Sequence, residues 1–425
     1  MTAYRRAMRP SLVKNRDFML LWSGEALSQL GSQASTVAFP LLVLALTGSA
    51  AKAGIVGLAK WLPLALTALP AGMAADRFDR KRLLLGSDAA RALLLASIPV
   101  TLWVGRPPFV QIAAVAFLDG CLFTVRYVAE RGALPHVVAA EQLPDAVAQN
   151  EARLFAANIV GPPLGGLLFA VARALPFGAD ACSYLVSMAT TAATRAKFQS
   201  ASRPRANEGL GGVAAGVRWL WAEPFFRAAS LLFAAGNPLF TGLYLLAILL
   251  AKQNGASSQA IGVLFALVGA GGLLGAVLAG PLRRRMRART ALVGEAWLMA
   301  CVLPLLFVTH AAPLIGLVVA AAEFPTPLTN SFVSGHRVAA TPDRLQGRVQ
   351  AAGTLTSMSL AWLGPLVIGF VFQRAGSSAT VLLVCGWAVL LAVVTTSLPA
   401  LRAGPPVRAP AGSDEVAPAA SGLPT

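Results

Sequence analysis

The sequence predicts an all-α membrane protein with about twelve transmembrane helices, arranged as two pseudo-symmetric bundles of about six helices each. Three observations lead to this prediction: a shortage of charge, a series of apolar segments of membrane-spanning length, and basic residues confined to alternate loops. Of the 425 residues, 56% are hydrophobic and only 12% are charged. A soluble domain carries about 25% charged residues, because water must wet its surface. Lipid must therefore cover most of the outside of this chain.

Apolar segments long enough to cross a bilayer, which takes about 20 residues, recur along the whole chain. The first follows a basic N-terminus, but it is too long for the apolar core of a signal peptide, so we expect an uncleaved helix. The predicted spans lie near residues 18–46, 53–75, 83–104, 109–131, 146–172, 177–195, 225–250, 259–281, 291–309, 312–334, 349–372 and 377–398.

Basic residues gather before the first span and in loops that lie on the same side of this arrangement. They precede the first span and fill the loops after the second, sixth, eighth and tenth spans. The intervening loops hold few, namely Lys52, Arg106, Arg173, Lys252 and Arg374. This positive-inside asymmetry places both termini in the cytoplasm and the protein in the inner (plasma) membrane. The net charge of +17 therefore indicates topology, and we expect no nucleic-acid partner.

The chain divides into five predicted parts. They are a cytoplasmic N-terminus (1–16), a first bundle (17–195), a linker with an interfacial helix (196–223), a second bundle (224–399) and a disordered cytoplasmic tail (400–425). The second bundle repeats sequence features of the first, since Gly364-Pro365 matches Gly161-Pro162 and Ala279-Gly280 matches Ala71-Gly72. The matching positions lie about two hundred residues apart, as expected for two parallel internal repeats.

The densest charge lies in the loop between the second and third spans, which reads G-x-x-x-D-R-x-x-R-K. Its members are Gly72, Asp76, Arg77, Arg80 and Lys81. The cations suit a cytoplasmic loop, but orientation requires no acid. An anion beside a helix N-terminus is stabilised by about 0.3–1 kcal/mol, because that end carries a partial positive charge. We therefore predict that Asp76 is a latch between this loop and the start of the eleventh span.

The predicted latch has partners on other helices. Asp76 would dock near Gly347 and Arg348, and the two arginines of the loop would pair with acids, for which the candidates are Asp88 and Glu130. Closing the latch would shut the cytoplasmic gate. The alternative is a solvated loop that serves only to orient the chain.

Acids inside the spans are costly in lipid and therefore mark candidate functional sites. Glu25 shares one helical face with Ser28, Gln29 and Ser32, and this face should line a cavity or, alternatively, a packed interface. We favour the cavity. The candidates for carrying a proton across the membrane are Glu25, Asp119 and Glu323.

Two further features bear on these acids. Glu323 precedes Pro325 and Pro327, and a helix that is interrupted twice beside an acid suggests a cavity wall. Lys60 offers an alternative to proton carriage, since it could neutralise one of the acids permanently.

The spans are rich in apolar and aromatic residues and hold few polar groups that converge. Such a lining suits a lipophilic or amphipathic solute better than a sugar, whose hydroxyl groups need many partners. The candidates for the cavity lining are Gln29, Phe39, Trp61, Phe240, Tyr244, Phe324 and Trp362.

Three motifs carry a resemblance to a known family. They are the loop that holds Asp76, the G-P-P-x-G-G of the fifth span (Gly161, Pro162, Gly165 and Gly166) and the P-D-x-x-x-G-R before the eleventh span. Together they resemble the drug-exporter side of the major facilitator superfamily. The segments NRDF, LWSGEALSQLGSQ, LTGSA and LGSDAARALLL are similar to its enterobactin-exporter-like and macrolide-efflux-like branch.

The resemblance implies a secondary active transporter that exports a drug, siderophore or secondary metabolite by alternating access, in exchange for protons. It implies multidrug resistance, no cofactor and a monomer, and it makes the G-P-P-x-G-G a marker of export. One departure concerns the fourth span, where the family's antiporters often carry an arginine three residues before a glycine. Here Phe117 stands at that distance from Gly120.

Other functional classes lack support in the sequence. It contains no H-E-x-x-H, no G-x-S-x-G and no G-x-x-x-x-G-K-[ST], so we expect no enzyme. The four cysteines lie singly in apolar spans, which indicates no metal site. The remaining alternatives are an importer of the same fold and a membrane sensor or scaffold that transports nothing.

Overall fold

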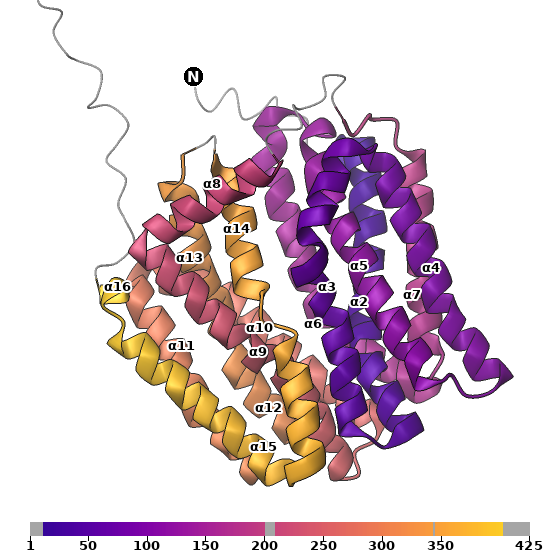
Figure 1. The fold of residues 1–425 in the computed structure, drawn as a ribbon, viewed down its shortest axis with the longest axis vertical. Helices are drawn as coiled ribbons and strands as arrows, with labels where there is room; N and C mark the ends of the chain where they lie inside the picture. The colour runs from indigo at the N-terminus through magenta and orange to yellow at the C-terminus, as the bar shows by residue number, and fades with distance from the viewer. Residues whose placement is uncertain (1–11, 200–208, 343–344, 403–425) are drawn as a thin grey trace, which may run out of the picture.

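The computed structural model describes residues 12–199, 209–342 and 345–402, and for Asp76 and Gly347 it describes only the backbone. Every regular element in these ranges is a helix (Figure 1). The first half holds α2 (Arg16–Thr47), α3 (Ala50–Arg77), α4 (Arg80–Val104), α5 (Phe109–Ala133), α6 (Leu143–Val171) and α7 (Leu175–Ala193), with short 3-10 turns at Leu12–Lys14, Leu134–His136 and Ala140–Gln142.

The second half begins after a connecting helix, α8 (Gly209–Ala222). It holds α9 (Pro224–Gln253), α10 (Ser258–Arg285), α11 (Ala288–Val302) with the 3-10 turn η5 (Leu303–Phe307), α12 (Ala312–Glu323), α13 (Thr326–Ala340), α14 (Gln346–Met358), α15 (Leu363–Ser397) and α16 (Pro399–Arg402). The two halves form two bundles that stand side by side in Figure 1.

Local sequence sets where several of these helices start and stop. Asn15, Ser49, Asp79 and Ser257 are N-caps whose side chains accept a backbone N–H from the first turn of α2, α3, α4 and α10. Gly48 ends α2 with φ 64°, a left-handed conformation that glycine adopts without strain. The turn between α2 and α3 is therefore only two residues long.

Nine helices in the described ranges are long and apolar enough to cross a membrane. One of them, Arg348–Ser397, contains two spans, because Gly376 has φ 80° and ψ −176° and reverses the chain inside α15 (Figure 1). With α3 and α7, which complete the first bundle, the described helices account for the twelve predicted spans. The predicted fold class is confirmed.

The tenth span differs from its prediction in one respect. It breaks once, between the end of α12 at Glu323 and the start of α13 at Thr326, and Pro327 is then tolerated in the first turn of α13. A second interruption is therefore absent from this span. The break leaves Glu323 on the last turn of α12.

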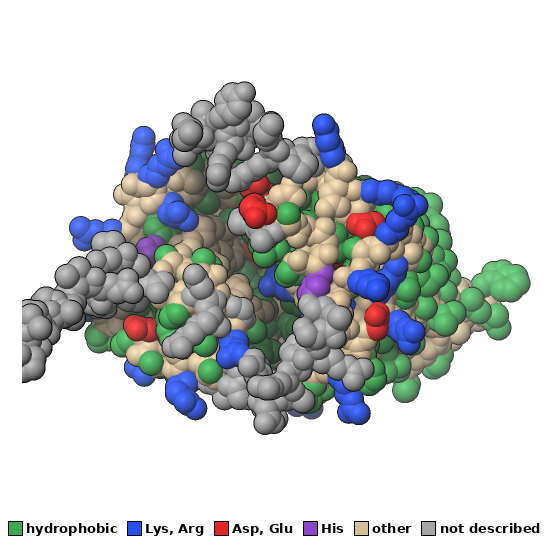
Figure 2. Space-filling model, turned by 90° about the horizontal axis from the view of Figure 1, so that it is seen from above, with side chains coloured by type: hydrophobic (Ala, Val, Ile, Leu, Met, Phe, Trp, Pro, Cys, Tyr) green, Lys and Arg blue, Asp and Glu red, His purple; other side chains and the backbone are tan. Residues whose placement is uncertain are grey.

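The loop between α3 and α4 defines one end of the molecule, which we call the basic end; the opposite end is the far end. Seen from the basic end, Lys and Arg side chains surround a hollow between the two halves (Figure 2). At the far end the halves touch: Gly54 of α3 lies against Gly369 of α15, and Gly166 of α6 lies against Gly262 of α10. The molecule is therefore open at the basic end and closed at the far end.

The predicted interfacial helix corresponds to α8, which lies across the second half at the basic end (Figure 1). Gly216 contacts the backbone of Arg348 at the start of α14, so the two helices approach closely. Trp219 stacks on Phe226 with ring centroids 5.6 Å apart, while Trp221 is exposed. One tryptophan thus packs against protein, and the other faces outward.

Candidate functional site

A cavity of about 370 Å³ lies between the halves, and both halves supply its walls. The volume falls in the range of about 300–1,000 Å³ that is typical of small-molecule sites. Its described lining is mostly apolar, with amide and hydroxyl side chains and only two charged residues, Lys60 and Glu323. Among the lining residues are Gln33, Phe39, Trp61, Phe155, Asn158, Asn237, Phe240, Thr241, Tyr244, Phe265, Thr326 and Asn330.

Four of the seven residues predicted for this lining are in it: Phe39, Trp61, Phe240 and Tyr244. The other three are placed elsewhere. Gln29 donates a hydrogen bond of 3.0 Å to Glu25 inside the first bundle, and Gln33, one turn on, takes the cavity position. Trp362 donates to the carbonyl of Ser359. Phe324 lies in the break of the tenth span, with its carbonyl against Gly275.

Lys60 lies on the first-half wall of the cavity, and its ammonium group contacts the carboxylate of Asp119. Asp119 is completely buried and also accepts a hydrogen bond of 2.8 Å from Nε of Arg91. The guanidinium of Arg91 lies 4.2 Å from the ring centroid of Tyr184. Both cations thus have a carboxylate partner, and the structure agrees with the neutralising role considered for Lys60.

Glu323 lies on the opposite wall, and its surroundings are different. The Tyr244 hydroxyl of α9 interacts with its carboxylate. Behind it, Glu295 of α11 accepts a hydrogen bond of 2.9 Å from the Thr326 hydroxyl. No ion pair in the described part of the chain involves either glutamate.

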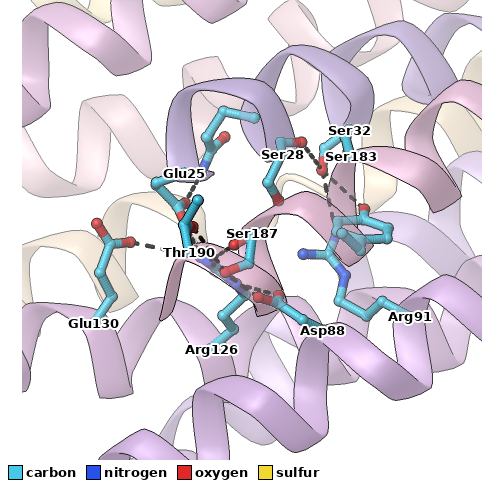
Figure 3. Close-up of polar contacts among 12 residues, drawn as sticks. Glu25, Ser28, Ser32, Asp88, Arg91, Arg126, Glu130, Ser183, Ser187 and Thr190 are labelled. Carbon is cyan, nitrogen blue, oxygen red and sulfur yellow. Dashed lines mark hydrogen bonds and ion pairs between the residues drawn. The ribbon is translucent and has the colours of Figure 1, made fainter. Parts of the chain in front are cut away.

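A network of ion pairs ties the helices of the first bundle together near the basic end (Figure 3). Arg126 of α5 contacts Glu25 of α2, and its Nε lies 2.5 Å from Asp88 of α4. Arg153 of α6 donates a hydrogen bond of 2.8 Å to Glu130. Opposite charges thus link four neighbouring helices in the interior of the bundle.

The network corrects two predictions. Glu25, Ser28, Gln29 and Ser32 are all buried inside the first bundle and do not line the central cavity, so the packed interface is the right interpretation of this polar face. The arginines of the charged loop do not pair with Asp88 and Glu130, because Arg126 and Arg153 already hold these two acids inside the membrane region.

The charged loop itself binds mainly backbone groups. Arg77 is exposed beside the Phe78 ring, and Arg80 donates a hydrogen bond of 2.6 Å to the carbonyl of Gly132. Lys81 donates to the carbonyls of Ala192 and Thr194, where α7 ends. A cation at a helix C-terminus is favourable, since that end carries a partial negative charge.

The latch remains a prediction. The Asp76 side chain lies outside the described residues, and so does Gly347 apart from its backbone. The two lie at the end of α3 and the start of α14, one in each half. Among the described side chains and neighbouring helices, no atom lies within 4 Å of the place where a Cβ of Gly72 would stand, so their packing does not require a glycine there.

The G-P-P-x-G-G motif lies where α6 meets two other helices. Gly161 and Gly165 pack on the backbone of α2, and Gly166 packs on Gly262 of α10. Pro162 lines the cavity. The motif thus permits close approach of three helices beside the cavity, and α6 continues through both prolines as one helix.

Three charged residues that organise the site have no assigned role in the sequence analysis: Arg91, Arg126 and Arg153. A signal for Arg91 was available, because a lone arginine in the middle of an apolar span must have a partner. Its partner, Asp119, lies 28 residues further along the chain, and only the packing of α4 against α5 brings the two together.

A protein-family model described as transmembrane secretion effector matches residues 10–410. The chain belongs to this family, within the major facilitator superfamily. The chain is similar to the multidrug efflux pump Tap of Mycobacterium tuberculosis, with 31% identity over 407 residues that cover 91% of this chain and 94% of the relative. It also matches the enterobactin exporter EntS of Salmonella typhi, with 25% identity over 217 residues, 51% of this chain and 52% of the relative.

Solved structures agree on the fold. A bacterial homologue of the lysosomal transporter Spinster, in an inward-facing and unoccupied conformation, superimposes with a TM-score of 0.66 at 14% identity, covering 90% of this chain and 96% of that one. The nucleoside transporter NupG gives a TM-score of 0.67 at 13% identity, covering 90% and 98%. The family model and the relatives confirm the predicted family. The chain is a multi-pass membrane transporter of a small molecule and not an enzyme.

Proposed function

We propose that this transporter exports a small lipophilic or amphipathic molecule by alternating access, in exchange for protons, and that Glu323 carries the proton. The protein would act as a monomer in the inner membrane with both termini in the cytoplasm. The two halves of one chain supply both walls of the cavity, so a second copy is not needed to complete it.

The observation that carries the proposal is the unequal pairing of the acids. Glu25 and Asp119, the other two candidates, each contact two basic residues and are stabilised in the charged form. Glu323 has no basic partner in the described part of the chain and lines the cavity. A carboxylate without a countercharge is costly at membrane depth, so Glu323 gains most from binding a proton.

The shape of the molecule supports transport from the cytoplasm to the outside. The positive-inside rule assigns the basic end to the cytoplasm, so the hollow between the halves is an entrance from the cytoplasm (Figure 2). The names of the relatives, a multidrug efflux pump and an enterobactin exporter, support transport out of the cell.

Alternating access requires the far end to open while the basic end closes. At the far end the halves meet through glycine against glycine, through a hydrogen bond of 2.9 Å from the backbone N–H of Ala50 to Gln373, and through buried apolar side chains of both halves such as Leu41 and Leu249. At the basic end, docking of Asp76 on the start of α14 would hold the closed form.

The test uses everted membrane vesicles, in which the cytoplasmic face points outward. With an acidic lumen, we expect ethidium and other lipophilic fluorescent probes to accumulate inside, and an uncoupler to abolish the accumulation. Glu323→Gln should lower the initial rate about tenfold or more. The matched control is Glu151→Gln, an exposed acid paired with Arg131 at the surface, which should transport normally.

Three results would contradict the proposal. Movement of the probes out of the lumen would indicate an importer. No movement at all would indicate a sensor or scaffold. Full uncoupler-sensitive transport by Glu323→Gln, at equal protein levels, would show that another group carries the proton.

A further inference from the structure

We propose that a second cavity, which opens at the far end and which we call the outer vestibule, binds a phosphate group between Arg173 of the first half and Lys252 of the second half, and that the bound anion holds the far end closed. The inference goes beyond the proposed function and depends on it only for the orientation that turns the far end to the outside. It follows from the position of the vestibule, from its positive charges and from the helix start beside them.

The outer vestibule has a volume of about 760 Å³ and shares no lining residue with the central cavity. Helix ends of both halves surround it: Arg173 follows the end of α6, Lys252 lies in the last turn of α9, and Ser258 starts α10. Its lining also includes buried apolar side chains of both halves, among them Leu41 of α2 and Leu249 of α9. A molecule in this vestibule therefore contacts both halves at once.

Arg173 and Lys252 are the charged residues of the described vestibule lining, and both are positive. They come from opposite halves and lie close enough for the charge of Arg173 to act on Lys252. Lys252 donates hydrogen bonds of 3.3 Å to the carbonyl of Ala256 and of 3.5 Å to the hydroxyl of Ser258. No ion pair in the described part of the chain involves either cation. Two like charges at short range repel each other, so an anion between them is attracted by both.

The protein has no acid of its own to place between these two cations. Neither Asp nor Glu occurs in the far-end connections between helices, which are residues 48–49, 105–108, 172–174, 254–257 and 308–311. The acid nearest to these connections in the sequence, Asp180, is completely buried inside the first bundle. The anion that neutralises the vestibule must therefore come from the solution or from the lipid.

The first turn of α10 adds backbone donors beside the two cations. A helix N-terminus carries a partial positive charge and N–H groups without intrahelical partners, which favours phosphate. Ser257, the N-cap, accepts the N–H of Ala260, whereas no hydrogen bond within the described ranges uses the N–H groups of Ser258 and Gln259. Ser257, Ser258 and Gln259 all line the vestibule. Two cationic side chains and two backbone donors thus border one cavity, and a phosphate group has enough acceptor oxygens to bind several of them.

A phosphate group at this position links the two halves. A hydrogen bond already joins the halves on the same wall, from the backbone N–H of Ala50 to Gln373, and both residues line the vestibule. When the far end opens, Arg173 and Lys252 move apart with their halves, and an anion that needs both loses one of them. A ligand that binds one of two conformations more tightly shifts the equilibrium toward it, so phosphate favours the closed far end. Without phosphate, the repulsion between the two cations favours opening.

The first test measures binding to the purified, detergent-solubilised protein by calorimetry and requires no transport. The probes are inorganic phosphate and dihexanoylphosphatidate, a short-chain lipid with a phosphate head group. The control is dihexanoylphosphatidylcholine, whose head group has no net charge. We expect both phosphate probes to bind and the control lipid to bind at least about tenfold more weakly than dihexanoylphosphatidate. Tighter binding of dihexanoylphosphatidate than of inorganic phosphate would support the site with membrane lipid as the source, and similar affinities would support it with free phosphate as the source.

Variants and their control locate the bound phosphate. Arg173→Met and Lys252→Met should each lower the affinity for inorganic phosphate about tenfold, and the double variant should lower it about a hundredfold. Lys52→Met is the matched control, since Lys52 is an exposed lysine at the start of α3 at the same end and does not line the vestibule. Absence of phosphate binding by the unchanged protein would overturn the inference even if a variant did not fold. Equal affinity of the folded double variant and the unchanged protein would overturn it as well.

A distance measurement tests whether phosphate holds the far end closed. Spin labels are attached at Arg106→Cys and His310→Cys, two exposed positions in far-end connections of opposite halves, after the native cysteines are replaced by serine. We expect phosphate to shift the distances between the labels toward the short distance of the closed form, and to have no such effect when Arg173→Met and Lys252→Met are added. A shift toward longer distances, or no shift with the vestibule unchanged, would overturn the inference. Because no transport is measured, these outcomes are independent of the direction of export and of the group that carries the proton.

Discussion

Gly166 of α6 lies directly against Gly262 of α10, and a Cβ added at Gly166 would stand 2.5 Å from the Gly262 Cα. The other side of the far end repeats this contact, since a Cβ added at Gly369 of α15 would stand 2.8 Å from the Cα of Gly54. Gly166 and Gly369 each follow a repeated Gly-Pro pair, Gly161-Pro162 in the first half and Gly364-Pro365 in the second. This internal repeat thus corresponds to two equivalent helix crossings, one on each side of the closed end. Small residues at such crossings let helix backbones approach closely.

The first prediction concerns this closure. Gly166→Ala and Gly369→Ala should each force the far end apart, because the added methyl group meets backbone that cannot move aside. We expect the initial rate of probe export to fall about tenfold or more. Gly262→Ala should be milder, because its nearest contact, the carbonyl oxygen of Pro163, is 3.2 Å away. The rates are measured in the everted vesicles described above.

The matched control for these variants is Gly280→Ala, on the same helix as Gly262. A Cβ at Gly280 has no atom within 4 Å, so this variant should transport at the normal rate. Equal losses for Gly280→Ala and Gly166→Ala would refute the role of the glycine contacts, since the effect would then come from glycine replacement itself.

The second prediction concerns the network around Arg126. Arg126→Gln removes the guanidinium group that Glu25 and Asp88 share, so that both buried carboxylates lose this positively charged partner. Breaking a buried ion pair on one side costs about 3–5 kcal/mol. Arg131→Gln removes only an exposed pair with Glu151, worth about 0.2–1 kcal/mol. Thermal unfolding of the purified variants should therefore show a large decrease in melting temperature for the first and almost none for the second. Similar decreases in melting temperature for Arg126→Gln and Arg131→Gln would contradict the different contributions to stability that we assign to the two ion pairs.

The fold could be predicted from the sequence because lipid imposes simple rules. Apolar length indicates a span, and the side of a basic loop indicates orientation. The helix break at Pro325 follows from the same local reasoning. These features depend on neighbours in the sequence, which a single chain displays directly.

The pairing of the acids could not be predicted in this way. Glu25 contacts Arg126, about a hundred residues away, and Asp119 contacts Lys60 and Arg91 on two other helices. Which cation reaches which acid depends on the rotation of each helix about its axis. The same uncertainty explains why Gln29 was assigned to the cavity wall that Gln33 occupies, since the two residues are one turn apart.

The third prediction concerns the latch. Asp76→Asn removes the negative charge that would dock on the start of α14 when the basic end closes. We expect the rate of export to fall about tenfold at normal surface expression, with binding of ethidium unchanged, because the open form keeps its cavity. Asp79→Asn is the matched control: Asp79 is the N-cap of α4 in the same loop, and Asn caps a helix about as well as Asp, so this variant should leave both stability and export nearly unchanged. Unimpaired export by Asp76→Asn would refute the latch and leave the loop only its role in orientation.

The fourth prediction separates the two cations on Asp119. Arg91 is almost completely buried, whereas Lys60 reaches the cavity. Arg91→Met leaves the buried carboxylate with Lys60 alone and should destabilise the protein by about 3–5 kcal/mol.

Lys60→Met leaves the Arg91 pair intact and should cost less stability, but it exposes part of the Asp119 charge to the cavity. We therefore expect Lys60→Met to bind ethidium, which is a cation, more tightly by about tenfold. The double variant Lys60→Met/Asp119→Asn should lose this gain, because the added negative charge is absent. Tighter binding that persists in the double variant would show that Lys60 acts through its own positive charge, and Asp119 would then have no part in setting the charge of the cavity.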